Sequence, residues 1–472
     1  MAKDTKDLHI VMVPWLAFGH MIPFYQFAAS LAKKGVKVSY ISTPRNINRL
    51  PKIPSELASH FQYITLPMPK IPDGYLPQQA EATVDVEFDQ IPHLKLAYDH
   101  LHDPIQSFVM SQSPDWIICD IISYWMPDVA KNCRARLMHF SVYTATMLCF
   151  VGPVEYLSED GYMKVRPTPD CLTKLPPWGG ILDPSVVFHG YEAARFHVGF
   201  YRKDPSGISD AERIANVLKG CDAVAVRSCR EFEKDSIELY QKLVRKPVVP
   251  VGLLPPVEPH EGDQCMDGKW DEVFKWLDQQ SRRSVVYVGF GSEYKLRKDE
   301  VYEIAYGLEL AEVPFIWGLR KPTWAMDDLE SLPSGFGTRT SGKGIVCIGW
   351  VPQLKILAHP SVRGSLFHSG WGSIIEILQH GHSLILLPCI VDQGLNARMM
   401  VEKGLGIEVE RREDGSFTRE DIACALKQAM LGDEAQKIRV EAMKAAAVFG
   451  DQKLHQEGYM NRVLEFLRNG SR

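Results

Sequence analysis

Short runs of aliphatic and β-branched residues alternate with longer stretches of helical periodicity along the whole chain. This alternation is typical of a parallel sheet with helices on both faces, because a parallel strand is buried on both sides and reads as a continuous apolar run. We predict strands at residues 8–13, 36–41, 61–66, 116–119, 137–140 and 223–226 in the first half, and at 285–290, 315–319, 344–348, 364–367, 384–387 and 406–409 in the second. Each half is therefore predicted to be a doubly wound α/β domain.

A proline-rich segment at residues 246–269 separates the two halves. Its prolines and glycines predict a linker without regular structure. We place the boundary near Gly252, which gives an N-terminal domain of residues 1–252, a linker of residues 253–269 and a C-terminal domain of residues 270–449. Residues 450–472 have helical spacing, and although this terminal helix could pack on either domain, we expect it to return to the N-terminal one.

The composition supports two cores and a small-molecule ligand. With 45% hydrophobic residues in 472, the chain is too long for one core, and its formal charge of -5 provides no basic surface for nucleic acid. No apolar run is long enough for a membrane span or a signal sequence, and the ten cysteines are scattered without a CxxC pair. We therefore expect a cytoplasmic protein with reduced thiols and no stable membrane insertion. The sequence leaves the oligomeric state open, and we expect a monomer.

Doubly wound sheets bind ligands at the carboxyl ends of their strands, which raises the question of a nucleotide. The stretch "GFGSEY" at residues 289–294 begins like a dinucleotide-binding turn, but Tyr294 takes the place of the third glycine. The second strand is followed by no acidic residue for a ribose, and the chain contains no GxxxxGK[ST] motif. These absences disfavour an NAD-binding domain and a P-loop, and leave other nucleotides open.

The most informative segment is residues 350–393, "WVPQLKILAHPSVRGSLFHSGWGSIIEILQHGHSLILLPCIVDQ". A predicted strand runs into the turn "HSGWGS", and a helix opens near Gly372, so backbone N–H groups and the helix dipole form an anion site that suits a diphosphate. His368 and Ser373 could donate to phosphate oxygens, and Glu376 could accept from ribose hydroxyls. Trp350 offers a flat face for a base. Each residue alone also has an ordinary explanation, such as a core tryptophan or a solvated glutamate, but their combination favours a nucleotide-diphosphate site.

This segment resembles the signature box of plant family-1 UDP-glycosyltransferases, whose pattern is W-x-P-Q, then H-C-G-W-N-S, a Glu and a closing D-Q. The resemblance covers essentially the whole chain and includes His20, "CD" at residues 119–120 and "YVGFGS". It implies a GT-B fold, with two Rossmann-like domains that face each other across a cleft. It also implies donor contacts for uridine, diphosphate and sugar from Ser292, Trp350, Val351, Gln353, His368, Gly370, Trp371, Gly372, Ser373, Glu376, Asp392 and Gln393, the last two on hydroxyls of the sugar.

The box departs from the family pattern at three places. Ser369 replaces the usual Cys, Gly372 replaces the usual Asn, and His382-Ser383 replaces the common Val-Pro. The loss of the Asn amide removes one phosphate donor and limits residue 372 to main-chain contacts, although glycine allows a closer approach. "PWLAFGHMIPF", Gly372 and "GLNARM" resemble most closely the branch that adds a sugar to a sugar already on an aglycone.

His20 stands where the first helix is predicted to begin, and Asp120 follows the strand "DWIIC". Transfer from a UDP-sugar already has a good leaving group, so it needs a base for the proton of the acceptor hydroxyl, and an imidazole held by a carboxylate suits that role. The resemblance likewise maps the family's catalytic pair onto these two residues. The alternatives are a first-turn histidine on a helix whose inward stripe includes Phe24, Phe27 and Leu31, and a strand-end turn aspartate.

Acceptor contacts are expected from loops of the N-terminal domain. The candidates are Trp15, Phe18, Gly19 and Ser141, and the stretches 72–94, 141–144 and 186–202. Their aromatic content suits a polycyclic phenolic or terpenoid glycoside, with ordinary packing as the alternative.

The predicted function is inverting, metal-independent transfer of a sugar from a UDP-sugar to a hydroxyl of a plant secondary metabolite. We expect UDP-glucose first, with UDP-rhamnose or UDP-xylose open, and a sugar hydroxyl of a terpenoid or flavonoid glycoside as acceptor. No DxD motif occurs, and "HGH" at residues 380–382 has no partners at ligand spacing, so we expect no metal and no cofactor, with the UDP-sugar as co-substrate. The alternatives are direct transfer to an aglycone, a UDP-sugar epimerase, and a UDP-sugar-binding protein without turnover.

Overall fold

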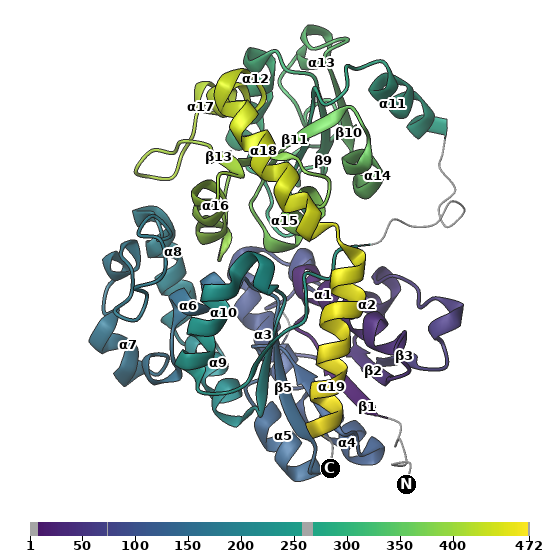
Figure 1. Ribbon diagram of the computed structural model, residues 1–472, viewed down its shortest axis with the longest axis vertical. Helices are drawn as coiled ribbons and strands as arrows, with labels where there is room; N and C mark the ends of the chain where they lie inside the picture. Colours follow the sequence, from purple (N-terminus) through teal and green to yellow (C-terminus); the bar gives the residue numbers. More distant parts are fainter. Residues whose placement is uncertain (1–7, 73, 257–267, 471–472) are drawn as a thin grey trace. The chain divides into compact units, whose positions relative to one another are not determined.

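The structure is a computed structural model that describes residues 8–72, 74–256 and 268–470 (Figure 1). The chain divides into two compact units, which are described separately. The N-terminal unit contains Met1–Leu182, Ala194–Leu254 and Gln452–Arg472, and the C-terminal unit contains Asp183–Ala193 and Pro255–Asp451. Most of the linker predicted at residues 253–269 lies outside the described residues.

The N-terminal unit is built on a seven-stranded parallel sheet of order β3-β2-β1-β4-β5-β6-β7. Its strands are β1 (His9–Val13), β2 (Lys37–Ser42), β3 (Phe61–Thr65), β4 (Trp116–Cys119), β5 (Arg136–Ser141), β6 (Ala223–Val226) and β7 (Val248–Pro250). The order reverses between β1 and β4, so residues that follow these two strands meet at the switch point where doubly wound sheets bind ligands.

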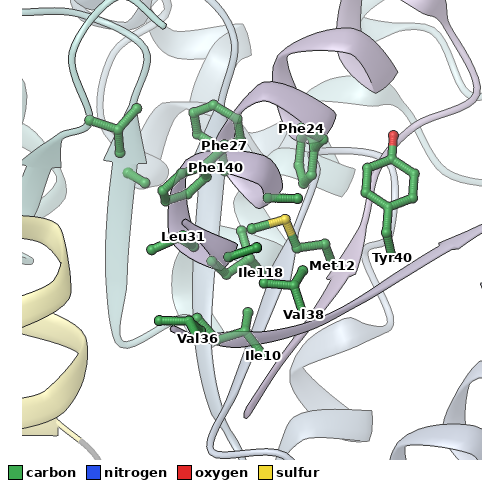
Figure 2. Close-up of a cluster of buried hydrophobic side chains, with 14 of the residues drawn as sticks. Ile10, Met12, Phe24, Phe27, Leu31, Val36, Val38, Tyr40, Ile118 and Phe140 are labelled. Atoms are coloured by element: carbon green, nitrogen blue, oxygen red, sulfur yellow. The ribbon is translucent and has the colours of Figure 1, made fainter. Parts of the chain in front are cut away.

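Helices connect these strands. They are α1 (Phe18–Ala32), α2 (Pro44–Arg49), α3 (Ile91–Asp99), α4 (His102–Gln112), α5 (Met126–Cys133), α6 (Ala145–Val151), α7 (Glu159–Val165), α9 (Asp210–Gly220) and α10 (Arg230–Val244), with 3₁₀ turns at Ser55–Leu57, Thr83–Asp85, Phe88–Gln90, Val154–Tyr156 and Pro169–Thr173. The inward stripe predicted for the first helix is confirmed, because Phe24, Phe27 and Leu31 are fully buried. Figure 2 shows these side chains packed with residues of the strands, including Met12 and Phe140. Each such burial contributes about 1.5–3 kcal/mol.

Every predicted strand is present, with ends that differ by two residues or fewer. The sequence reading was wrong at β7, which lies inside the segment predicted to lack regular structure. Val248 pairs with Val224, and the strand ends at Pro250. A proline is tolerated here because β7 is the edge of the sheet and needs hydrogen bonds on one side only.

The C-terminal unit is built on a six-stranded parallel sheet of order β10-β9-β8-β11-β12-β13. Its strands are β8 (Val285–Gly289), β9 (Phe315–Leu319), β10 (Gly344–Ile348), β11 (Val362–Phe367), β12 (Ser383–Leu386) and β13 (Gly406–Glu408). Its helices are α11 (Gly268–Asp278), α12 (Lys298–Ala311), α13 (Phe336–Arg339), α14 (Gln353–Ala358), α15 (Trp371–Leu378), α16 (Gln393–Glu402), α17 (Arg419–Met430) and α18 (Gly432–Phe449). The order of this sheet reverses between β8 and β11.

Two segments belong to a different unit from their neighbours in the sequence. The last helical segment, a π-helical turn at Leu454–Tyr459 followed by α19 (Met460–Gly470), belongs to the N-terminal unit, where the indole of Trp116 donates to the carbonyl of Leu467 at 3.0 Å. Residues 183–193, where α8 (Gly190–Tyr201) begins, belong instead to the C-terminal unit. There Glu192 forms an ion pair of 2.6 Å with Arg398, a contact that no local sequence signal indicates.

Candidate active site

His20 and Asp120 meet at the switch point of the N-terminal sheet. His20 lies in the first turn of α1, which follows β1, and Asp120 directly follows the neighbouring strand β4. The Nδ1 atom of His20 lies 2.8 Å from Oδ2 of Asp120. Both residues are buried, at 9% and 1% exposure. The structure therefore brings together the two residues that the sequence singled out.

The surroundings of Asp120 keep its carboxylate ionised. Burial alone would raise the pKa of Asp120, but the charge and hydrogen bond of His20 and the N–H groups of Trp15 and Ile121 together lower the pKa below its usual value. These N–H groups lie 3.0 and 2.7 Å from the carboxylate oxygens. An ionised carboxylate can only accept, so Nδ1 of His20 donates to Asp120, and Nε2 lies on the other side of the ring.

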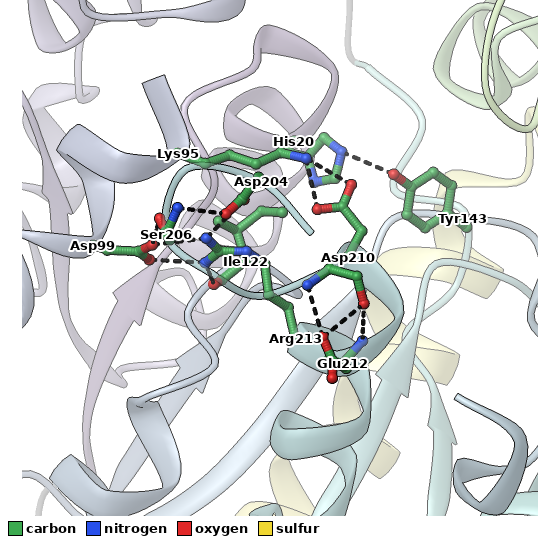
Figure 3. Close-up of polar contacts among 11 residues, drawn as sticks. His20, Lys95, Asp99, Ile122, Tyr143, Asp204, Ser206, Asp210, Glu212 and Arg213 are labelled. Atoms are coloured by element: carbon green, nitrogen blue, oxygen red, sulfur yellow. Dashed lines mark hydrogen bonds and ion pairs between the residues drawn. The ribbon is translucent and has the colours of Figure 1, made fainter. Parts of the chain in front are cut away.

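Tyr143 lies against Nε2, the second ring nitrogen of His20. Its hydroxyl is 3.4 Å from Nε2 of His20, and the two rings meet edge to face with centroids 5.5 Å apart (Figure 3). Tyr143 follows β5, and its N–H donates to the hydroxyl of Ser141 at 3.3 Å. Ser141 itself is fully buried. The sequence analysis proposed residues 141–144 as acceptor contacts but assigned no role to Tyr143. No local sequence feature indicates that this residue contacts His20.

A buried arginine holds the backbone that follows Asp120. Arg213 of α9 is fully buried and lies between Asp99 and Asp204, at 2.7 and 3.0 Å (Figure 3). Its guanidinium also donates to the carbonyl of Ile122 at 3.1 Å. The loop that carries Asp120 is thus tied to α3 and α9, through a residue that sequence reasoning missed.

The remaining candidates beside His20 differ in accessibility. Trp15 is buried and packs edge to face on Tyr98, with centroids 5.3 Å apart. Phe18 is half-buried, and Gly19 is exposed, with no atom within 4 Å of where a β-carbon would stand. Phe18 and Gly19 therefore have the surface that contact with a ligand requires, whereas Trp15 mainly packs.

In the C-terminal unit, the turn after β11 has the expected form of an anion site. His368 directly follows the strand, Ser369 adopts a left-handed φ of 63°, and Gly370 caps α15, which begins at Trp371, next to the expected position at Gly372. The amino end of the helix has no side-chain cap, and the first N–H groups of a helix have no partner within the helix itself.

His368 packs closely within this turn. A β-carbon at Gly291 would lie 2.8 Å from its ring and one at Gly370 would lie 2.7 Å from it, so any larger residue at either position would displace the imidazole. Nδ1 of His368 and the hydroxyl of Ser369 are buried and have no hydrogen-bond partner among the described residues. Burial lowers the pKa of His368 to about 4, which keeps the imidazole neutral at pH 7.

Three polar side chains form a chain beside this turn. The hydroxyl of Tyr287 donates to Oε1 of Gln353 at 2.9 Å, and Nε2 of Gln353 donates to Glu376 at 2.6 Å. Trp350 is 63% exposed, with its ring edge to face with Trp270 at 6.0 Å. The structure therefore gives Gln353 and Glu376 a fixed orientation and leaves the ring of Trp350 largely exposed.

Asp392 and Gln393 lie at the start of α16 and are both buried. The side-chain oxygen of Gln393 accepts from the N–H groups of Cys389 and Ile390, at 3.0 and 2.9 Å. Asn396 donates to Asp392 at 2.7 Å and also to the carbonyl of residue 369, at 3.2 Å. The start of α16 is thereby tied to the turn that contains His368.

Four further donor candidates are placed as follows. Val351 is half-buried, and its side chain lies close above Gly318. Ser292 is exposed, and its carbonyl accepts from Arg320. Ser373 and Gly372 are half-buried in the first turn of α15, whereas the ring of Trp371 is buried against Phe449. Trp371 can therefore reach a ligand only through its backbone.

The described residues contain no group of three His, Cys, Asp or Glu side chains that could hold a metal ion. Their nine cysteines are all free thiols. No helix in the described part of the chain has the length and apolar character needed to cross a membrane.

Comparison with known proteins agrees with this geometry. Residues 223–456 match the family described as UDP-glucoronosyl and UDP-glucosyl transferase. The chain is 42% identical over 468 residues to UDP-glycosyltransferase 91C1 of Arabidopsis thaliana, an alignment that covers 99% of this chain and 98% of that protein. It is also 36% identical over 471 residues to soyasaponin III rhamnosyltransferase of Glycine max, covering 99% and 96%.

The fold is likewise similar to that of solved structures. The crystal structure of Arabidopsis thaliana UGT89C1 complexed with UDP-L-rhamnose superposes with a TM-score of 0.74 at 24% identity, and covers 98% of this chain and all of that one. This confirms the predicted pair of Rossmann-like domains.

Proposed function

The chain belongs to the plant family-1 UDP-glycosyltransferases, and from this premise we propose that it transfers a sugar to a hydroxyl of a plant metabolite with inversion and without a metal ion. The observation that carries the proposal is the contact of 2.8 Å between His20 and Asp120, which leaves Nε2 of the imidazole as a base. UDP is a good leaving group, so the reaction needs a base more than an acid.

The proposed step forms one bond and breaks one. The acceptor oxygen attacks the anomeric carbon of the donor while its proton moves to Nε2 of His20. The bond between the anomeric carbon and the β-phosphate oxygen breaks, and UDP leaves with the electron pair. The carboxylate of Asp120 stabilises the imidazolium that forms. Attack from the side opposite the leaving group inverts the anomeric carbon.

The diphosphate is proposed to bind at the turn after β11. The first N–H groups of α15, which have no side-chain cap, and the hydroxyl of Ser373 would donate to phosphate oxygens there, and Nδ1 of His368 is a buried polar atom without a partner among the described residues. These donors would stabilise the charge that develops on UDP, so the proposal needs no metal ion.

The rest of the donor is proposed to bind around this turn. The exposed ring of Trp350 would stack on uracil, and the oriented pair Gln353 and Glu376 would hold the nucleoside. Asp392 and Gln393 would contact hydroxyls of the sugar. We infer UDP-glucose as the first donor, with UDP-rhamnose supported by the rhamnosyltransferase relative and UDP-xylose still open.

The proposed acceptor is a sugar hydroxyl of a terpenoid or flavonoid glycoside. The support is the likeness of residues 14–24 and of Gly372 to the branch that extends sugars, and a relative named for a saponin substrate. The free cysteines support a reducing, cytoplasmic location. We propose a monomer that needs no resident cofactor.

A donor and acceptor panel tests the proposal. The protein is incubated with UDP-glucose, UDP-rhamnose or UDP-xylose, with flavonoid and terpenoid glycosides or their aglycones and with EDTA, and the products are read by mass spectrometry. Addition of one sugar to the glycosides is expected. Gain on aglycones alone would contradict the acceptor class, and binding of UDP with no transfer would favour a binding protein without turnover.

Binding measurements with two variants separate the donor site from the base. Glu376→Gln should weaken UDP binding by about tenfold or more, because a charged acceptor of hydrogen bonds is lost. His20→Ala should change UDP affinity by less than about threefold. Equal effects of the two variants on UDP binding would contradict the assignment of roles.

A further inference from the structure

Three arginines of the C-terminal unit lie close enough for the charges of Arg283 and Arg439 to act on Arg363, and Arg363 and Arg283 both contact α18. Arg283 precedes β8, Arg363 lies near the start of β11, and Arg439 lies on α18. We propose that this arginine cluster, Arg283, Arg363 and Arg439, is a binding site for a phosphate group. The site is separate from the donor turn, by which we mean the turn after β11 that contains His368. Arg363 lies near the start of β11 and His368 directly follows its end, about 17 Å away along the strand.

Arg363 is aimed by an irregularity of the sheet. Val362 pairs with Val285, but Gly364 pairs with Val286, so Arg363 is the extra residue of a β-bulge. Such bulges redirect a side chain out of the regular alternation. The arginine is 6% exposed, and one terminal nitrogen donates to the carbonyl of Ala435 on α18 at 3.4 Å. Its Nε atom is buried and has no partner among the described residues.

The other two arginines approach the same face of α18. Ala435, Arg439 and Met443 follow one another at one-turn spacing, so they share a helix face. Arg283 reaches this face, because its terminal nitrogen lies 3.1 Å from the sulfur of Met443. It does so from a left-handed φ of 58°, which is strained for an arginine. The Nε atom of Arg439 is also buried without a partner among the described residues.

The positive charges of this cluster have no neutralising carboxylate within the described part of the chain. Among the residues that the structure describes, no Asp or Glu forms an ion pair with any of the three arginines. Arg363 is buried, Arg283 and Arg439 are half-buried, and a buried guanidinium group is ordinarily paired. Burial and the nearby charges of Arg439 and Arg283 lower the pKa of Arg363 to about 10. The fold therefore holds three cations together against their repulsion.

A phosphate group matches this arrangement better than other small anions. Guanidinium groups present several N–H donors in a plane and bind phosphate oxygens in pairs. A phosphate has enough oxygens and charge to accept from three such groups at once, whereas a chloride or a single carboxylate does not. The same chemistry is offered by free phosphate and by the phosphomonoester of a small metabolite.

Calorimetric titration of the full-length protein tests the proposal. UDP is present at saturation so that the donor turn is filled, and inorganic phosphate or glycerol 3-phosphate is titrated at constant ionic strength against chloride. The wild-type protein should bind phosphate at one site with a Kd below about 1 mM. Arg363→Gln and Arg439→Gln should weaken this binding by about tenfold or more, whereas Arg282→Gln, at the exposed neighbour, should not.

Stability of the variants separates lost binding from lost folding. In phosphate-free chloride buffer, Arg439→Gln should unfold at the same temperature as the wild type or a higher one, because one of three like charges is removed. Binding of glycerol 3-phosphate would support a phosphomonoester ligand, and binding of inorganic phosphate alone would support a free anion. Absence of phosphate binding by the wild type, or equal binding by all variants, would overturn the proposal.

Discussion

Nδ1 of His20 lies 2.8 Å from Oδ2 of Asp120, although 100 residues separate the two along the chain. The fold creates this contact because β1 and β4 are neighbours in the sheet and both residues follow the carboxyl ends of these strands. The hydrogen bonds to Asp120 fix both the carboxylate and the imidazole. The pair therefore acts as a unit, and its two members should respond to substitution as a unit.

Substitutions at the pair should be strongly non-additive. His20→Ala should lower kcat by about 10²- to 10⁴-fold, because the acceptor proton loses its base. Asp120→Asn should lower kcat as well, since an amide cannot stabilise the imidazolium, and the double variant should be no worse than His20→Ala alone. Steady-state kinetics with a fixed acceptor measures all three. Losses of the single variants that multiply in the double variant would show that the residues act independently.

Tyr143→Phe should affect acceptor binding more than turnover. The hydroxyl of Tyr143 occupies the position that an acceptor hydroxyl would take at Nε2 of His20, and a weak hydrogen bond contributes about 0.5–1.5 kcal/mol. Removal of this competitor should lower the acceptor KM by up to about tenfold with little change in kcat. A large loss of kcat in Tyr143→Phe would instead assign the phenol to the proton transfer itself.

Arg213→Met should destabilise the protein by about 3–5 kcal/mol, because two carboxylates whose side chains are only 10% and 8% exposed lose their partner. Activity of the folded fraction should also fall, since the carbonyl of Ile122, two residues after Asp120, loses its donor. Lys437→Gln serves as control, because Lys437 forms an exposed ion pair of little energetic value. Urea denaturation compares the variants, and equal stability of the two would refute a supporting role for Arg213.

Stability should fall as the pH drops below about 6.5, in part because of His382. Burial, with the charges of His380 and Arg283, lowers the pKa of His382 to about 3 in the folded protein. The unfolded chain therefore binds a proton between pH 6.5 and about 3 that the folded chain does not, which costs about 2 kcal/mol at pH 5. In His382→Asn the loss of stability between pH 7 and pH 5 should shrink by that amount. An unchanged loss in thermal or urea unfolding would exclude this histidine as a source.

The sequence predicted the sheets well because their strands are buried on both faces and read as continuous apolar runs. It failed at β7, where prolines at residues 247 and 250 conceal an edge strand that needs few hydrogen bonds. It also assigned residues 183–193 to the N-terminal half. The ion pair between Glu192 and Arg398, which places them in the C-terminal unit, depends on tertiary structure.

The sequence likewise identified some residues of the candidate site and missed others. His20 and Glu376 could be selected from residue type and position in the chain, and Gln393 from the resemblance to the family's signature box. Tyr143 and Arg213 could not, because each acts on a residue about 90 to 120 positions away and carries no local signature. The arginine cluster likewise depends on a bulge and on a helix face that only the folded chain reveals.

The configuration of the product tests the central claim most directly. The protein is incubated with UDP-glucose, in which the sugar is α-linked, and with a glycoside acceptor in the presence of EDTA, and the new linkage is determined by proton NMR. We predict a β-linked glucoside, formed without a metal ion and abolished in His20→Ala. An α-linked product, or transfer that His20→Ala leaves intact, would contradict direct displacement with His20 as the base.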